Sequence, residues 1–141
     1  SVSYFIEQGY PTDSLLIYLC TIANSNYEEF RLANPEASIA DFKLSYNKFS
    51  LDGALFDLEK INNISKDVIF KTPIDTLVNN VRVWAKSYDQ NLLSLINTDE
   101  EMFKKILKTL LFIMDKSLKL MRRTLIFIRG LHQASMLWII M

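Results

Sequence analysis

The chain has 141 residues, half of them hydrophobic, and its 16 basic and 16 acidic side chains give a formal net charge of zero. This length suffices for one globular domain with a core, or for two small helical domains. Only three glycines and three prolines are present. Because β-sandwiches and barrels need many turns, the composition disfavours them and predicts an all-α fold.

Three observations disfavour membrane and secreted classes. The longest uncharged runs, residues 14–27 and 130–141, are shorter than the roughly 20 apolar residues that a membrane span needs. The N-terminus lacks the basic and then apolar regions of a signal peptide. The single cysteine, Cys20, excludes an internal disulfide and predicts a buried thiol in a reducing compartment. We therefore expect a cytoplasmic protein with no membrane partner.

The first predicted helices flank a Gly-Tyr-Pro turn. Residues 2–8 have the pattern of a helix that Gly9 ends, and Pro11 and Thr12 begin the next helix with Asp13 in its first turn. The predicted buried stripe of this second helix follows helical spacing. It consists of Leu15, Leu16, Leu19, Ile22 and Ala23.

A short helix and a long loop are predicted next. Residues 24–38 indicate a short helix between polar turns, in which Tyr27 and Phe30 contact the core. Its water-facing residues are expected to be Glu28, Glu29 and Arg31. Ser38 and Asp41 fit a variant of the capping box. The following residues are typical of a loop that ends in an Asp52-Gly53 turn.

The rest of the chain alternates apolar stripes with helix-start signals. We expect one helix over residues 54–61, and a separate one that starts with Ser65 as its N-cap. Two further capping boxes are predicted, Thr72 with Asp75 and Thr98 with Glu101. Between them one stripe contains Leu77, Val81, Trp84, Ala85 and Tyr88. A final basic helix is expected over residues 100–129, so the chain reads as an irregular bundle of about seven helices.

The net charge of zero conceals a split along the chain. Residues 1–103 carry eight Lys/Arg and fifteen Asp/Glu, a net charge of −7, whereas residues 104–141 carry eight Lys/Arg and one acid, a net charge of +7. Such asymmetry is typical of a surface for nucleic acid or membrane. Mutual attraction of the two halves explains it equally well.

No catalytic, metal or cofactor residue is predicted in this chain. His132 is the only histidine and Cys20 the only cysteine, so a His/Cys metal site is disfavoured. A Ser-His-acid triad would depend on His132 alone. The three isolated glycines form no phosphate-binding loop.

Three segments, "GYPTDSLLIYLCTIANSN", "GALFDLEKINNIS" and "WAKSYDQNLLSLI", occur in an informative order. Together they resemble the middle of bacterial glutamyl-tRNA synthetases, most closely the clostridial branch. The matches to the first family element are Gly9, Tyr10, Leu16, Tyr18 and Leu19, and those to the second are Phe56, Asp57, Lys60 and Ile61. The family continues with Trp-x-Asn where this chain has Asn63-Ile64-Ser65, which leaves open any contact assigned to that asparagine.

The resemblance covers residues 1–107 and implies a place after the catalytic domain, because the His-x-Gly-His and Lys-x-Ser-Lys motifs of that domain are absent. It implies a helical stem-contact-like region at residues 1–71 and an anticodon-side bundle at 72–141, with an atypical basic C-terminal helix. The implied function is a tRNA-binding connector that positions glutamate-accepting tRNA for an absent catalytic domain of the same enzyme. That parent ligase uses ATP and magnesium, and neither has a site implied in this segment.

The candidate RNA contacts are polar side chains around the second family element. Recognition of an RNA backbone needs lysines on rigid elements and polar groups that reach riboses and phosphates. The candidates are Lys43, Lys48, Lys60, Asn62 and Lys66. The alternative for each lysine is a solvated side chain without a ligand.

From about Lys108 the resemblance stops. Four hypotheses remain for this end: a slipped reading frame in an AT-rich gene, a basic amphipathic helix that docks on a partner or RNA, a membrane-surface helix, and a core helix with a basic exposed side. The second would make the chain a non-catalytic protein-interaction module. Apolar residues at the terminus, Trp138, Ile139 and Ile140, leave a homodimer through the C-terminal helix open.

Overall fold

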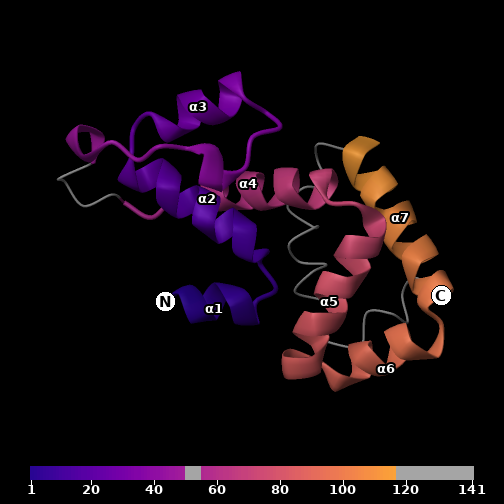
Figure 1. The fold of residues 1–141 in the computed structure, drawn as a ribbon. Coiled ribbons are helices and arrows are strands. Elements are labelled where there is room, and N and C mark those ends of the chain that lie inside the picture. Colours follow the sequence, from indigo (N-terminus) through magenta and orange to yellow (C-terminus); the bar gives the residue numbers. More distant parts are fainter. Residues whose placement is uncertain (50–54, 117–141) are drawn as a thin grey trace. The chain divides into compact units, whose positions relative to one another are not determined.

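The computed structural model describes residues 1–49 and 55–116 (Figure 1). Within these residues the fold is all-α, as predicted, with seven α-helices, two short 3₁₀ turns and no strand beyond one isolated bridge. The elements are α1 (Val2–Glu7), α2 (Thr12–Ala23), α3 (Tyr27–Ala33), η1 (Ile39–Asp41), η2 (Tyr46–Lys48), α4 (Leu58–Lys71), α5 (Ile74–Tyr88), α6 (Gln90–Thr98) and α7 (Glu100–Lys116). The part of the expected C-terminal helix beyond Lys116 lies outside the described residues.

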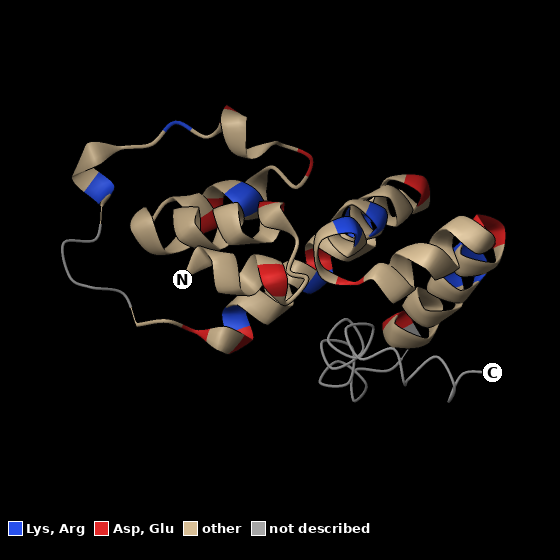
Figure 2. Cartoon of the chain, turned by 90° about the horizontal axis from the view of Figure 1, so that it is seen from below, with Lys and Arg blue, Asp and Glu red and all other residues tan. Residues whose placement is uncertain are grey.

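The chain forms two compact units. One unit is Tyr10–Val68, called the arm unit below. The other combines Ser1–Gly9 with the described residues from Ile69 onward and is called the three-helix unit. Helix α4 begins in the arm unit and ends in the three-helix unit. Basic and acidic residues are intermixed on the described helices, so neither unit is of a single sign (Figure 2).

The three-helix unit is built on α5, α6 and α7, which follow one another with single-residue connections (Figure 1). Its core is a cluster of apolar residues that are at most 7% exposed: Val78, Ala85, Leu92, Ile96 and Phe103. Full burial of one large apolar side chain stabilises a fold by about 1.5–3 kcal/mol. This cluster therefore provides the main stabilising contact among the three helices.

Helix α1 belongs to the same unit. The Trp84 indole Nε1 donates a hydrogen bond of 2.9 Å to the Ile6 carbonyl oxygen, which ties the end of α1 to α5. Gly9 follows with a φ of 82°, a left-handed conformation that glycine adopts without a Cβ clash. The prediction that Gly9 ends the first helix is confirmed.

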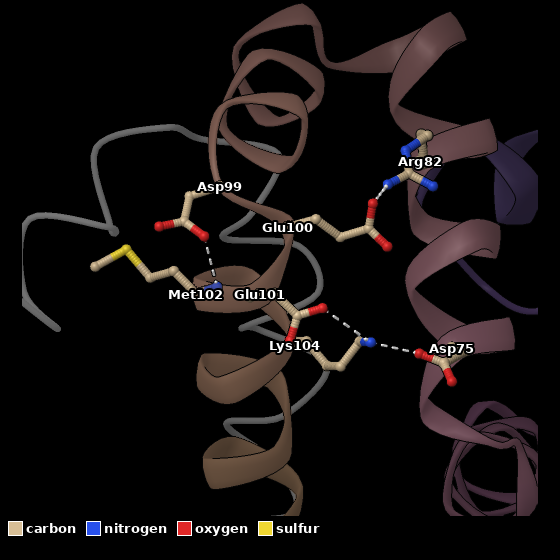
Figure 3. Close-up of polar contacts among 7 residues, drawn as sticks. All are labelled: Asp75, Arg82, Asp99, Glu100, Glu101, Met102 and Lys104. Carbon is tan, nitrogen blue, oxygen red and sulfur yellow. Dashed lines mark hydrogen bonds and ion pairs between the residues drawn. The ribbon is translucent and has the colours of Figure 1, made fainter.

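Each connection in the three-helix unit is one aspartate that serves two helices. The Asp89 amide donates to the Ala85 carbonyl at the end of α5, and Asp89 Oδ1 accepts from the Leu92 amide at 2.9 Å in the first turn of α6. Asp99 does the same between α6 and α7, since its Oδ1 accepts from the Met102 amide at 2.9 Å (Figure 3).

The predicted capping box of Thr98 with Glu101 is therefore wrong by one residue. The Thr98 hydroxyl instead donates to the Ser94 carbonyl at 2.7 Å, within α6. Glu101 Oε1 lies 3.4 Å from Lys104 Nζ rather than reaching back to the cap. Thr98 and Asp99 are both favourable N-cap residues. Thr98 is still the last residue of α6, so Asp99 caps α7.

Ion pairs on the surface connect α5 with α7 (Figure 3). Arg82 pairs with Glu100, and Lys104 Nζ lies 2.6 Å from Asp75 Oδ1. The hydrogen bond from Lys104 lowers the pKa of Asp75, and the same bond raises the pKa of Lys104. Because the Asp75 carboxylate is exposed to water, the pair fixes orientation more than it adds stability.

In the arm unit, the buried face of α2 differs from the predicted stripe. Leu15 is buried as expected, but Leu16 is 46% and Leu19 is 42% exposed. Ser14 and Tyr18 are buried instead. Their hydroxyl groups form hydrogen bonds within the arm unit, so both residues can be buried at little energetic cost. A prediction from apolar spacing alone does not select them.

Helix α4 is one continuous helix, so the predicted break before Ser65 is wrong. Residues 55–57 are not helical, and α4 starts at Leu58, where Asp57 Oδ1 accepts from the Lys60 amide at 3.0 Å. Ser65 lies inside the helix and is 2% exposed. Its hydroxyl donates to the hydroxyl of Ser14 at 2.9 Å rather than capping a helix.

Other local predictions are confirmed. The capping box of Ser38 with Asp41 is present, although it starts the short turn η1 rather than an α-helix. Tyr27 is 2% exposed and anchors α3.

The predicted burial of the Cys20 thiol is not confirmed, because Cys20 is only partly buried. No described helix combines the length and apolar character that crossing a bilayer requires.

Candidate nucleic-acid interface

The two family elements meet in the arm unit through side chains. The Tyr10 hydroxyl donates to Asn62 Oδ1 at 2.8 Å, and the Tyr18 hydroxyl accepts from the Asp57 amide at 2.7 Å. Phe56 packs edge-on against the Tyr18 ring at 5.4 Å between centroids. These side chains thus join α2 and the short segment before it to the beginning of α4.

A buried pair of hydroxyls extends the same junction. Ser65 Oγ donates to Ser14 Oγ, which in turn donates to the Pro11 carbonyl at 2.6 Å. Both serines are at most 2% exposed, and Ile61 and Ile64 are buried on the same helix α4. Each buried hydroxyl has a partner, so the junction holds α4 at a defined register along α2.

Residues 34–49, called the arm, run irregularly from α3 and contain η1 and η2. Asn24 at the end of α2 is fully buried, and its Nδ2 donates to the Ser45 carbonyl at 2.9 Å. The Ser25 amide donates to the Lys48 carbonyl at 3.3 Å, and Asn24 forms an antiparallel bridge with Phe49. The end of the arm is therefore fixed to the turn between α2 and α3.

Aromatic packing holds the earlier part of the arm. The Phe42 ring lies 4.9 Å from the Tyr27 ring and 5.1 Å from the Phe30 ring. Such ring pairs add about 0.5–1.5 kcal/mol beyond the area that they bury. The arm is thus attached to α3 at Phe42 and to the α2–α3 turn at residues 45–49.

The five candidate RNA contacts fall on two elements. Lys43 and Lys48 are on the arm, and both side chains are exposed without an ion pair to another described residue. Lys60, Asn62 and Lys66 are on α4 and are half-buried. Figure 2 shows basic residues on both segments of the arm unit, with acidic residues near the start of α4.

The two candidates at the start of α4 already have partners. Lys60 Nζ lies 3.1 Å from Glu28 Oε2, which links α4 to α3. Asn62 Oδ1 is the acceptor of the Tyr10 hydroxyl, so its amide nitrogen is the group left for a ligand. A phosphate at Lys60 would have to share the ammonium with Glu28. Lys43 and Lys48 have no such competing carboxylate among residues 1–49 and 55–116.

A feature of the arm that the sequence reading missed is an exposed aromatic pair. Tyr46 is 90% and Phe49 is 38% exposed, and their rings stack with centroids 6.0 Å apart and an interplanar angle of 29°. The signal in the sequence is the interleaving of rings and lysines in "KLSYNKF", residues 43–49. Such interleaving is typical of single-stranded nucleic-acid binding.

Metal and thiol chemistry have little support in the part of the chain that the structure describes. No group of three or more His, Cys, Asp and Glu residues there could hold a metal ion. Burial raises the pKa of the Cys20 thiol, which reduces its thiolate fraction at neutral pH and hence its nucleophilicity.

Comparison with known proteins identifies the relatives of this chain. No family model matches it, and no solved structure does. It is similar to the glutamate–tRNA ligases of Clostridium perfringens strain 13 (43% identity over 106 residues), Acetivibrio thermocellus (40% over 106 residues) and Sorangium cellulosum (33% over 107 residues). These matches cover 75–76% of the chain.

The matched region is a small part of each relative. It is 19% of the Clostridium perfringens ligase and 19% of the Acetivibrio thermocellus ligase, so the chain spans about a fifth of the length of the curated relatives it matches. The resemblance that the two motif elements indicated is confirmed, including its clostridial character. Over three quarters of its length, the chain is therefore a relative of one segment of the bacterial glutamate–tRNA ligases.

Proposed function

We propose that this chain is a tRNA-binding connector of a glutamate–tRNA ligase. It positions a glutamate-accepting tRNA while glutamylation takes place on a catalytic domain elsewhere in the enzyme. The relationship to the ligases supports the partner class. The observation that carries the binding role is a pair of exposed lysines, Lys43 and Lys48, on an arm fixed to helices α2 and α3. Neither lysine forms an ion pair with another described residue.

The physical argument rests on how a protein holds an RNA backbone. Lysines contribute to affinity when they contact phosphates and displace condensed counterions. A lysine on a fixed segment loses less conformational freedom on binding than one on a loose loop. The backbone of Lys48 is held because its carbonyl accepts a hydrogen bond from the Ser25 amide. The backbone of Lys43 is held because the preceding residue, Phe42, packs against Tyr27. Both side chains are thus presented from anchored backbone.

The residues on α4 serve mainly to hold the arm unit together in this proposal. Lys60 links α4 to α3 through its ion pair with Glu28, and Asn62 Oδ1 accepts a hydrogen bond from the Tyr10 hydroxyl. Their contact with RNA is secondary to these contacts. Lys66 is half-buried on the same helix and reaches the surface only in part.

Chemistry is assigned to the rest of the enzyme. ATP, magnesium and glutamate would be held by the catalytic domain, and this segment would contribute binding energy and orientation to the tRNA. The alternative, a helical interaction module that uses the basic C-terminal helix, depends mostly on residues beyond Lys116. That helix end and a homodimer through it stay predictions.

The test is fluorescence anisotropy of the full 141-residue chain with labelled glutamate tRNA and an unrelated tRNA. We expect tighter binding to the glutamate tRNA. Replacing Lys43 and Lys48 together by Ala is expected to weaken that binding several-fold. Lys86→Ala is the matched control, because Lys86 is exposed on α5 in the other unit.

The outcomes separate the candidate functions. Equal affinity for both tRNAs that is unchanged in the Lys43/Lys48 double variant would contradict the connector proposal and favour nonspecific attraction by the basic C-terminal end. Loss of affinity in Lys86→Ala as large as in the double variant would also contradict the assignment of the arm.

A further inference from the structure

The most exposed part of the arm carries an aromatic pair that its packing does not require. Tyr46 is 90% exposed, compared with 46% for Tyr4 and 39% for Tyr88. A ring so exposed contributes little to folding by burial. We propose that Tyr46 is a stacking platform for an unpaired RNA base, with Lys43 and Lys48 on the neighbouring phosphates.

The local backbone explains why the two rings are stacked. Tyr46 begins the 3₁₀ turn η2, and the Phe49 amide donates to the Tyr46 carbonyl at 3.4 Å. In a 3₁₀ turn, side chains three residues apart lie on the same side. The turn thus places Phe49 beneath Tyr46, with 6.0 Å between the ring centroids and 29° between their planes. Phe49 orients the tyrosine ring.

The turn is also held in place from below. The Ser45 carbonyl accepts from Asn24 Nδ2, and the Lys48 carbonyl accepts from the Ser25 amide, so both ends of η2 are attached to the α2–α3 turn. Asn24 is fully buried and also accepts from the Asn26 amide through Oδ1. A platform held this way is presented at little cost in conformational entropy on binding.

The chemistry around the ring favours RNA over an apolar partner. Lys43 and Lys48 flank Tyr46 in the sequence, and neither has an ion pair with another described residue. A base that stacks on an aromatic ring brings its own phosphates with it, and lysines on either side match their charge. A protein ligand would gain from the ring but would need acidic residues for the lysines, and it is treated as an outcome of the test.

This inference rests on the proposed function and makes it more specific. The connector proposal identifies the bound RNA as tRNA, and the stacking proposal states how the chain holds one of its bases. The experiment therefore uses three probes with the full chain: glutamate tRNA, a short single-stranded RNA, and a fully paired RNA duplex. The variants are Tyr46→Ala and Tyr46→Phe. Tyr4→Ala is the matched control, since Tyr4 is another exposed tyrosine that contacts a phenylalanine ring.

Stacking of one base on an aromatic ring predicts a loss of about 5- to 150-fold in affinity for single-stranded RNA in Tyr46→Ala. Tyr46→Phe keeps the ring and is expected to bind like the unmodified chain, and the duplex, which offers no unpaired base, is expected to be insensitive to either change. A second measurement is ultraviolet cross-linking of RNA containing 4-thiouridine, followed by mass spectrometry. It is expected to place the adduct on Tyr46.

The results distinguish the two proposals. If the chain binds glutamate tRNA and Tyr46→Ala binds it and the single strand equally well, the platform is overturned while the connector stands. If the single strand binds and depends on Tyr46, but glutamate tRNA is not preferred over an unrelated tRNA, the connector fails while the platform stands. Capture of acidic peptides in place of RNA, or no binding to any of the three RNAs, overturns the platform.

Discussion

Ser14 and Ser65 show how much of this fold depends on single polar residues. Both hydroxyls are buried, one donates to the other, and the chain of bonds ends on the Pro11 carbonyl. Neither position would be assigned to a core from hydrophobicity, because serine is mostly exposed in folded proteins. The sequence accordingly predicts Ser65 as a helix cap and gives Ser14 no structural role. The tertiary contact between two helices decides their real role.

The serine pair makes a measurable prediction. Ser65→Ala removes one donor and is expected to lower the free energy of unfolding by about 0.5–1.5 kcal/mol, the net value of one hydrogen bond. Ser14→Ala is expected to cost more, about 1–3 kcal/mol, because it leaves the buried Ser65 hydroxyl without its acceptor. Denaturant unfolding followed by circular dichroism measures both changes.

The double variant tests the coupling between the two hydroxyls. Because Ser14→Ala already breaks their bond, adding Ser65→Ala should cost little more, so the two effects should not add. Ser87→Ala, on the exposed side of α5, is the control. Strict additivity of the two serine changes would show that the hydroxyls do not interact in solution.

At the scale of helices, the corners of the three-helix unit depend on aspartates that act for two helices at once. Asp89 closes α5 with its amide and opens α6 with its carboxylate, and Asp99 repeats this between α6 and α7. The second oxygen of Asp89, Oδ2, is buried without a partner among the described residues. Asp99, in contrast, is exposed, so it can be replaced without leaving a buried backbone amide that has lost its acceptor, as replacing Asp89 would do to Leu92.

The helix boundary at Asp99 gives a second prediction. Asp99→Ala removes the side-chain acceptor of the Met102 amide and is expected to lower the free energy of unfolding by about 0.5–2 kcal/mol. Asp99→Asn keeps an oxygen at the cap and should retain most of the stability. Thr98→Ala should cost less than Asp99→Ala, since Thr98 bonds only within α6. Thermal melts of the three variants measure these differences in stability. A larger loss for Thr98→Ala than for Asp99→Ala would contradict the assignment of Asp99 as the cap and support the predicted capping box of Thr98 with Glu101.

The contrast between α4 and α5 shows what helical periodicity can and cannot predict. The stripe of α5 was predicted from spacing alone, and Ala85 and Leu77 on it are buried. In α4 the sequence "NNIS" contains residues that favour turns and caps, so a break was expected there. The helix continues because Ile61, Ile64 and Ile69 are buried along its length. Packing across the unit overrides the local preference.

For the whole molecule, the charge split along the chain bears on the proposed binding of RNA. Residues 1–103 carry a net charge of −7, although Lys43 and Lys48 lie within them. We therefore expect weak binding that depends on a few lysines and declines as salt rises. The slope of log affinity against log salt should fall by about 0.7–0.9 for each phosphate contact that is removed.

The salt dependence of the arm variants checks this expectation. Replacing both Lys43 and Lys48 by Ala should reduce the slope for glutamate tRNA by about 1.4–1.8. Tyr46→Ala should lower affinity but leave the slope nearly unchanged, because stacking releases few counterions. Anisotropy titrations across a salt series measure both, and an unchanged slope in the double lysine variant would mean that neither lysine contacts a phosphate.

The sequence was sufficient to predict the fold class and the family, but not which side chains are available on the surface. Few turn residues and clear helical spacing predicted an all-α chain, and the order of three sequence segments predicted the family. Lys60 and Asn62 were chosen as RNA contacts because of their residue type, yet the fold engages both with protein partners, Glu28 and Tyr10. Tyr46 was passed over because exposure of a single ring depends on where the arm is attached.

The single-residue corners at Asp89 and Asp99 have a consequence for how such a chain can change over evolution. One residue inserted at either corner would separate the amide that ends one helix from the carboxylate that starts the next. The helix on one side of the corner would then turn by about 100° about its axis relative to the other, and the buried Leu92 and Ile96 of α6 would no longer face the same core as Val78 and Phe103. The corners therefore do not tolerate insertions or deletions. The arm, whose irregular backbone is attached at only a few points, is where lengthening is compatible with the core, and new binding specificity can arise there without any change to the three-helix unit.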